Sequence, residues 1–140
     1  MRWPGSRAAK PFARPQRWLG IWWGMIAVVI VGSLLPALLL PDLPAGSDKI
    51  EHLLGYAILA AMAVQVFAGW RALTAAAVFL VALGVGIEVA QDVLTTTRAM
   101  DAMDAVANTC GVVLGAASAL TPLRDALLRA DQRYEASSRR

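Results

Sequence analysis

Charged residues are scarce in this chain. Only 16% of its 140 residues are Asp, Glu, Lys or Arg, whereas 58% are hydrophobic. A soluble domain averages about 25% charged and about 45–50% apolar residues. Both departures argue against an ordinary water-soluble domain and favour a membrane protein. The length leaves no room for a large soluble core beside four membrane spans.

Cysteine is almost absent as well. Because Cys110 is the only one, no disulfide can form within one chain. It lies in an apolar run, where we expect it to act as a small hydrophobic residue. The sequence also lacks a phosphate-cradling glycine loop, a nucleophile elbow and a paired-cysteine metal site. Whether the chain is an enzyme is therefore left open by its motifs.

The net charge of +3 does not indicate nucleic-acid binding, because the basic residues are segregated. Five precede the first apolar run and five follow the last, out of thirteen in the chain. A nucleic-acid-binding protein would place them on one folded face with stacking aromatics. Tail positions instead orient a membrane protein and attract anionic lipids. We expect membrane lipids as partners and no nucleic acid.

Four apolar segments predict an all-α, polytopic membrane protein built as a four-transmembrane-helix bundle. The first is too long for a signal peptide, whose apolar core spans about 7–15 residues. Residues 1–17 are expected to form a basic cytoplasmic tail, disordered or lying on the surface. Residues 122–140 are expected to form a second basic tail with a short amphipathic helix or, equally, a solvated segment. The predicted helices are 18–40, 48–69, 72–94 and 101–121, within a transmembrane domain at 18–121.

The distribution of basic and aromatic residues predicts the orientation. Basic tails favour the cytoplasm, and an even number of spans then returns both termini to that side. Arg71, in the short loop after the second span, agrees with this topology. Trp18 and Trp70 stand at the same predicted interface, a depth that indoles prefer. Both termini are therefore expected to be cytoplasmic.

The remaining polar residues fall in three stretches that this topology brings to the outer face. Their spacing places several on common helix faces, as with Asp48 and His52 at i,i+4. Intramembrane ionisable groups are costly, and they either pair in the bundle interior or line a wet cavity. The stretches contain Asp48, Lys49, Glu51 and His52, then Glu88, Gln91 and Asp92, then Arg98, Asp101, Asp104 and Asn108.

The stripe on the fourth span continues from polar to small residues. Gly111 and Gly115 follow Asn108 at steps of three and four, which predicts close helix packing below the polar groups. The outer cluster is acidic when His52 is neutral. Six carboxylates cannot all be ionised at close range in a low dielectric, so either some are protonated or a divalent cation joins them.

These stretches resemble the VanZ-like membrane protein family, which is named for a protein associated with resistance to the glycopeptide teicoplanin. The matching blocks are S-D-K-I-E-H-L-L-G-Y at 47–56, I-E-V-A-Q at 87–91 and R-A-M-D-A-M-D-A-V-A-N-T-C-G-V-V-L-G at 98–115. Order and spacing are intact over about half the chain. Thr97 departs from the glycine that many relatives have before the arginine. The resemblance implies a protein of the bacterial cytoplasmic (inner) membrane and the cell envelope.

Several functions fit this pattern. In the first, an outward-facing pocket binds or modifies a lipid-linked envelope precursor, with Lys49 and Arg98 on phosphate and His52, Glu88 and Asp104 in acid–base steps. Asp48, Gln91 and Asn108 would complete the pocket. In the second, His52, Glu88 and Asp104 hold a cation. The alternatives are an ion or proton relay in a small transporter that needs oligomerisation, and a structural partner in which polar pairs hold the helices together.

Overall fold

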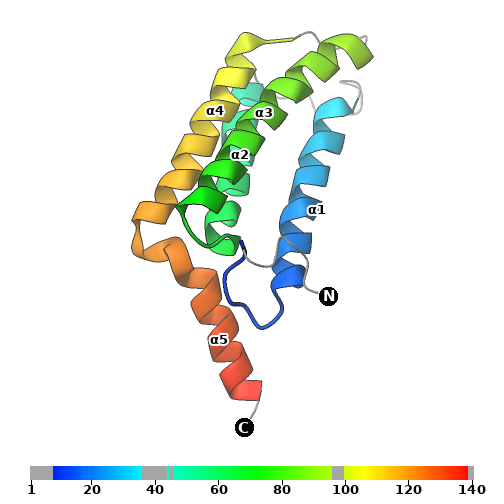
Figure 1. Cartoon of the computed structure of the whole chain (residues 1–140). Coiled ribbons are helices and arrows are strands. Elements are labelled where there is room, and N and C mark those ends of the chain that lie inside the picture. The colour runs from blue at the N-terminus through cyan, green and yellow to red at the C-terminus, as the bar shows by residue number, and fades with distance from the viewer. Residues whose placement is uncertain (1–7, 36–43, 45, 96–99, 139–140) are drawn as a thin grey trace.

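The computed structural model describes residues 8–35, 44, 46–95 and 100–138. Helices account for almost all of this part, and its only strand-like pairing is an isolated antiparallel bridge between Ala9 and Phe67. Figure 1 shows α1 to α4 running side by side, with α5 projecting below them and both ends of the chain at the bottom. The helices are α1 (Pro15–Leu34), α2 (Ser47–Val66), α3 (Trp70–Leu94), α4 (Ala102–Ala117), η3 (Ser118–Leu120), η4 (Pro122–Asp125) and α5 (Ala126–Ser138).

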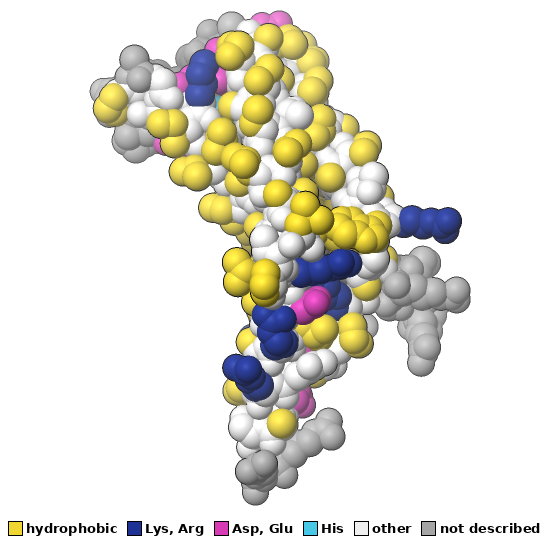
Figure 2. All heavy atoms as spheres, turned by 90° about the vertical axis from the view of Figure 1, so that its left-hand side faces the viewer, with side chains coloured by type: hydrophobic (Ala, Val, Ile, Leu, Met, Phe, Trp, Pro, Cys, Tyr) yellow, Lys and Arg dark blue, Asp and Glu magenta, His cyan; other side chains and the backbone are white. Residues whose placement is uncertain are grey.

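Within the described residues, four helices are long and apolar enough to cross a membrane: Pro15–Leu34, Ser47–Val66, Trp70–Leu94 and Ala102–Leu120. Their outward faces carry large apolar side chains, such as Val28, Val78 and Val113, each more than 60% exposed. In Figure 2 apolar side chains cover the middle of the visible face, while charged side chains gather near its two ends. A lipid-facing belt between two polar zones identifies a multi-pass membrane protein.

The helix boundaries differ from those expected for identifiable reasons. Helix α1 begins at Pro15, three residues early, because proline suits the first turn of a helix, where its missing N–H is not needed. Helix α2 ends at Val66, three residues early. There Val66 O accepts a bond from Lys10 N at 2.9 Å, and Ala68 N donates to Ala8 O at 2.6 Å. The predicted end of the first span, residues 36–40, lies outside the described residues.

The expectation of a disordered or surface-lying N-terminal tail is wrong for residues 8–14. Lys10 and Phe12 are only 4% and 6% exposed. The Lys10 ammonium donates to Val64 O at 2.7 Å and to Arg124 O, and it pairs with the Asp125 carboxylate at 2.8 Å. These acceptors can satisfy a lysine that no sequence pattern marks as buried. The segment therefore ties the end of α2 to the start of the C-terminal region.

Helices α2 and α4 form the closest contact in the bundle. A Cβ atom added to Gly111 would overlap the carbonyl oxygen of Leu53, and one added to Gly115 would overlap that of Ala57. Only glycine allows two backbones to approach this far. The small residues of α4 therefore sit directly against α2, as the spacing predicts.

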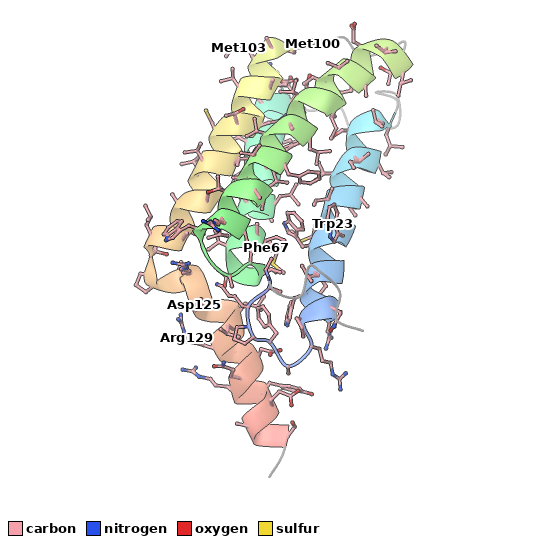
Figure 3. The ribbon with its side chains drawn as sticks, viewed as in Figure 1. Trp23, Phe67, Met100, Met103, Asp125 and Arg129 are labelled. Carbon is pink, nitrogen blue, oxygen red and sulfur yellow. The ribbon has the colours of Figure 1, made fainter. Side chains whose placement is uncertain are left out.

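Helix α1 joins the bundle through aromatic side chains. The Trp22 ring lies edge-on to Phe67 at 5.0 Å between centroids, and its Nε1 donates to Leu59 O at 3.1 Å. Trp23 contacts Phe79 of α3 at 5.6 Å. Figure 3 shows Trp23 and Phe67 near the middle height of the molecule, Trp23 on α1 and Phe67 between α1 and the other helices.

The C-terminal helix forms as expected, and its start is anchored to the bundle. Gln65 Nε2 donates to Leu123 O at 2.9 Å, and Gln65 Oε1 accepts from Leu127 N at 3.0 Å. Asp131 accepts bonds from Ala13 N and Trp18 Nε1. No residue of α5 is buried. The helix therefore extends away from the spans, with Leu127 and Leu128 partly covered and Tyr134 exposed.

Candidate functional site

The polar stretches meet where α2 and α4 begin and α3 ends, at the top of Figure 1, which we call the polar end. Met100 and Met103, labelled in Figure 3, mark it at the start of α4. Gly46, with a φ of 87°, makes the left-handed turn before α2 and is suited to it by lacking a Cβ. Asp101 caps α4, because its carboxylate accepts a bond from Met103 N at 2.8 Å. These two features place the first turns of α2 and α4 side by side.

The centre of the site is a group of four side chains from three helices, which we call the polar cluster: His52, Glu88, Asp104 and Asn108. His52 Nδ1 lies 3.0 Å from Asn108 Oδ1, a hydrogen-bond distance, and 4.0 Å from Glu88 Oε1. His52 Nε2 lies 3.6 Å from Asp104 Oδ2. The single histidine of the chain therefore touches polar groups on both other helices.

The side chains of the polar cluster are largely buried. Glu88 is 0% exposed, Asn108 1% and Asp104 9%, and the His52 side chain is 13% exposed. Such burial of ionisable groups costs free energy unless they are paired or bind a ligand. One ligand atom from each of His52, Glu88 and Asp104 lies within 4.8 Å of the others. The arrangement is suited to proton transfer, hydrogen bonding or cation binding.

Lys49 covers the polar cluster from α2. Its ammonium is 2.9 Å from Asp101 Oδ2, 3.1 Å from Asp104 Oδ1 and 3.4 Å from Asp48 Oδ2. The hydrogen bond from Lys49 holds the pKa of Asp101, just before α4, below its ordinary value. The ammonium therefore contacts three carboxylates, those of Asp48, Asp101 and Asp104. With Glu88 as a fourth acidic group, the site has more acidic than basic side chains.

In the part of the chain that the structure describes, three buried polar atoms lack a hydrogen-bond partner: Glu88 Oε1, Asn108 Nδ2 and the Tyr56 hydroxyl. The other carboxylate oxygen of Glu88 accepts a bond from Asp101 N at 3.3 Å. Buried polar atoms are nearly always paired in proteins, so each unpaired one needs an explanation. Glu88 Oε1 is the most notable, because it belongs to an acidic group beside the His52 ring.

Other residues of the predicted site lie elsewhere. Gln91 is buried, but its amide donates to Ser33 O of α1 at 2.7 Å, so it joins helices rather than the polar cluster. The Asp48 side chain is 56% exposed and forms an ion pair with Lys49, which itself contacts the polar cluster. Asp92 is exposed and accepts from Met100 N at 3.4 Å. The expected phosphate contact at Arg98 lies outside the described residues.

An apolar groove runs along the outside of α3 and α4, nearer the middle of the bundle. Its volume is about 490 Å³. Val112 is one helical turn from Asn108, or about 6 Å along the axis, and Ala82 is two residues from Gly84. Gly84 packs on Asn108, because a Cβ there would lie 3.1 Å from the Asn108 side chain. The groove is lined by Ala77, Val78, Val81, Ala82, Val112, Val113 and Ala116.

Two features of the molecule were not anticipated from the sequence. The groove arises from alanines at helical spacing, a pattern that also occurs in ordinary packing. The polar contacts of Lys10 depend on residues more than fifty positions away, and no local signal marks them. Cys110 is exposed on α4, within one of the candidate membrane spans.

Comparison with known proteins yields no relative. No protein-family model matches the chain, and no curated protein or solved structure is significantly similar to it.

Proposed function

We propose that the chain is an envelope membrane protein that binds the phosphate-bearing headgroup of a membrane lipid at its polar end. The observation that carries this proposal is the position of the polar cluster about one helical turn from an apolar groove. A ligand that reaches both surfaces must be amphipathic. A lipid-linked envelope precursor, with phosphate at the head and a hydrocarbon chain behind it, has this chemistry.

The polar part of the site offers suitable contacts. Lys49 is 39% exposed, so its ammonium can exchange a carboxylate partner for a lipid phosphate. His52 and Asp104 lie behind it at hydrogen-bonding or proton-transfer range of a bound headgroup. The end of a membrane-spanning bundle is also the depth at which lipid phosphates lie.

The apolar groove fits the hydrocarbon chain of a lipid rather than a helix of another protein. The groove lies on the lipid-facing side of α3 and α4, and small side chains such as Ala77, Ala82 and Ala116 make it shallow and narrow. A flexible hydrocarbon chain can follow such a groove while its head stays at the polar end. We therefore place chain and headgroup of one molecule along the α3–α4 face.

Orientation and family membership belong to the same proposal. Basic residues at both termini support a cytoplasmic location for them, so the polar end would face outward in the bacterial inner membrane. The three VanZ-like blocks support an envelope role and, through that family, a link to teicoplanin resistance. Measuring glycopeptide susceptibility with and without expression tests that link directly.

The lipid proposal is tested by mass spectrometry of lipids retained by purified protein. We expect wild type to retain a phosphate-bearing polyprenyl lipid. Ala77→Leu, which fills the groove, should reduce retention several-fold. Ala75→Leu is the matched control, because Ala75 is exposed on the same helix and does not line the groove. Retention of bulk lipids alone, in the same proportions by all three proteins, would refute the proposal.

A structural role is the second candidate, and the hydrogen bond between His52 and Asn108 favours it because the bond joins α2 to α4. Polar pairs of this kind contribute about 1 kcal/mol between membrane helices. Under this alternative, His52→Ala and Asp104→Asn would lower thermal stability and leave lipid retention unchanged. Under the lipid proposal, both variants insert normally and lose the retained lipid.

A further inference from the structure

We propose that His52, Glu88 and Asp104 hold one divalent cation. One ligand atom from each lies within 4.8 Å of the others. Zn²⁺ binds nitrogen and carboxylate oxygen at about 2.0–2.2 Å, so two of its ligands are at most about 4.4 Å apart. Small side-chain rotations would therefore close the three groups around an ion without moving a helix.

The unpaired oxygen of Glu88 is independent evidence for a ligand here. The Glu88 side chain is 0% exposed, yet among the described residues its Oε1 has no hydrogen-bond partner, and it lies 4.0 Å from His52 Nδ1. An acidic oxygen without a donor is expensive in a buried setting. A cation within reach of Glu88 Oε1 and the other two ligand atoms would satisfy this oxygen, whereas the polar cluster alone does not.

The hydrogen bond to Asn108 prepares His52 for metal binding. In the proposed site, Asn108 Oδ1 accepts a hydrogen bond from His52 Nδ1, so the ring carries its proton on Nδ1 and offers the Nε2 lone pair to the ion. Nε2 is the nitrogen that lies nearer Asp104 Oδ2, at 3.6 Å. Metal-binding histidines commonly donate their other N–H to a neighbouring carbonyl or carboxylate in this way. Asn108 is thus a positioning residue for the ligand His52.

Charge balance points to a divalent ion. Lys49 binds Asp104 through Oδ1 and so leaves Oδ2 on the side of His52. Four acidic side chains (Asp48, Glu88, Asp101 and Asp104) against the ammonium of Lys49 leave an excess of negative charge, which a divalent ion would offset. Imidazole with carboxylates suits Zn²⁺ or Mn²⁺ better than Mg²⁺, which prefers an all-oxygen environment.

The ion would also reconcile an acidic site with a phosphate ligand. Three protein ligands leave at least one coordination position open, and a phosphate oxygen can occupy it. This bridging role rests on the proposed lipid function, whereas binding of the ion itself does not.

Titration of purified, tag-free protein with Zn²⁺ and with Mn²⁺ tests the site, after metal removal by a chelator. We expect one ion per chain, and a Kd about 10-fold or more weaker in Glu88→Gln, which removes a ligand charge at constant size. Asp92→Asn should bind as wild type does, because Asp92 is exposed on the same helix outside the polar cluster. No uptake by wild type, or equal affinity in Glu88→Gln, would overturn the proposal.

A measurement on wild type alone covers the case in which variants fail to fold. Because His52 is the only histidine, ¹⁵N-histidine labelling reports on this ring without assignment. We expect Zn²⁺ to shift the Nε2 resonance while Nδ1 stays protonated; an unchanged spectrum at saturating Zn²⁺ would overturn the site. Metal uptake without retained polyprenyl lipid would uphold the site and refute the lipid function, so the two failures are distinguishable.

Discussion

The Glu88 carboxylate is fully buried in the bundle. Among the described residues, only one of its two oxygens accepts a hydrogen bond. Such a residue destabilises the fold it belongs to unless something compensates the charge. This free-energy cost comes from the acidic group alone, because replacing Glu88 with the glutamine amide of the same shape removes the acidic group and keeps the packing. Glu88 therefore separates ligand binding from helix packing better than any other residue of the site.

We expect Glu88→Gln to change stability in opposite directions with and without metal. Without metal the variant should unfold at the same temperature as wild type or higher, because a buried charge is gone. With Zn²⁺ at a hundred times its Kd, wild type should gain about 2.7 kcal/mol and the variant should gain little. Thermal unfolding in detergent measures both. A strong loss of stability in metal-free Glu88→Gln would instead mark the residue as a packing contact.

At the scale of elements, the α2–α4 contact determines how close the ligating side chains come. His52 is on α2, whereas Asp104 and Asn108 are on α4, and the glycines of α4 hold the two backbones together next to them. The distance between α2 and α4 therefore sets the spacing of the ligating side chains as well as the packing of the bundle.

Gly115→Ala should destabilise the bundle by about 1–3 kcal/mol, because overpacking at a tight contact forces backbones apart. Its Cβ would meet Ala57 O and lie 2.8 Å from Ala60 Cβ. Gly86→Ala is the control: nothing lies within 4 Å of its Cβ, and alanine is the better helix former. Thermal unfolding should rank Gly86→Ala at or above wild type and Gly115→Ala well below it. Equal stability of both variants would contradict the close contact.

Sequence periodicity was sufficient for the spans and for the grouping of His52, Glu88 and Asp104, because helical spacing and topology determine both. It misplaced Gln91, since the same i,i+3 relation to Glu88 leaves the direction of a side chain undetermined until a neighbour is known. Gln91 turns toward Ser33 of α1. Lys10 could not be predicted as buried, because its acceptors come from two distant segments.

The Lys10–Asp125 pair should make docking of the N-terminal segment sensitive to acid. Figure 3 shows Asp125 and Arg129 near the upper end of the C-terminal helix, just below the four spans. The hydrogen bond from Lys10 lowers the pKa of Asp125 from its ordinary 3.8. The carboxylate's contribution is thus complete above pH 3.8 and is lost as pH falls through the lowered pKa.

Hydrogen exchange at the Lys10 amide measures this, since that amide donates to Val66 O. The protection factor should be several-fold higher in wild type than in Asp125→Asn near neutral pH. The two proteins should converge in acid. A difference that persists unchanged at low pH would contradict the role given to the ion pair.

For the whole molecule, the proposed orientation places the two polar zones on opposite sides of the membrane. The single cysteine is convenient here, because Cys110→Ala provides a cysteine-free background. In that background Asp48→Cys should react with an impermeant maleimide from outside the cell, and Ser137→Cys only after the membrane is opened. The reverse pattern would invert the topology and move the polar cluster to the cytoplasmic face.

The contacts of residues 8–14 have a consequence for the order of assembly. Lys10 and Ala13 are translated before the four spans, yet their partners Arg124, Asp125 and Asp131 are translated after them. The four spans can enter the membrane one after another, but this closure must wait until the segment after the fourth span has been made. A chain truncated before Arg124 would keep all four spans and the Lys10 contact with Val64 O, but would lose the contacts with Arg124 and Asp125. The stability of the N-terminal segment would then report whether the segment after the fourth span is present.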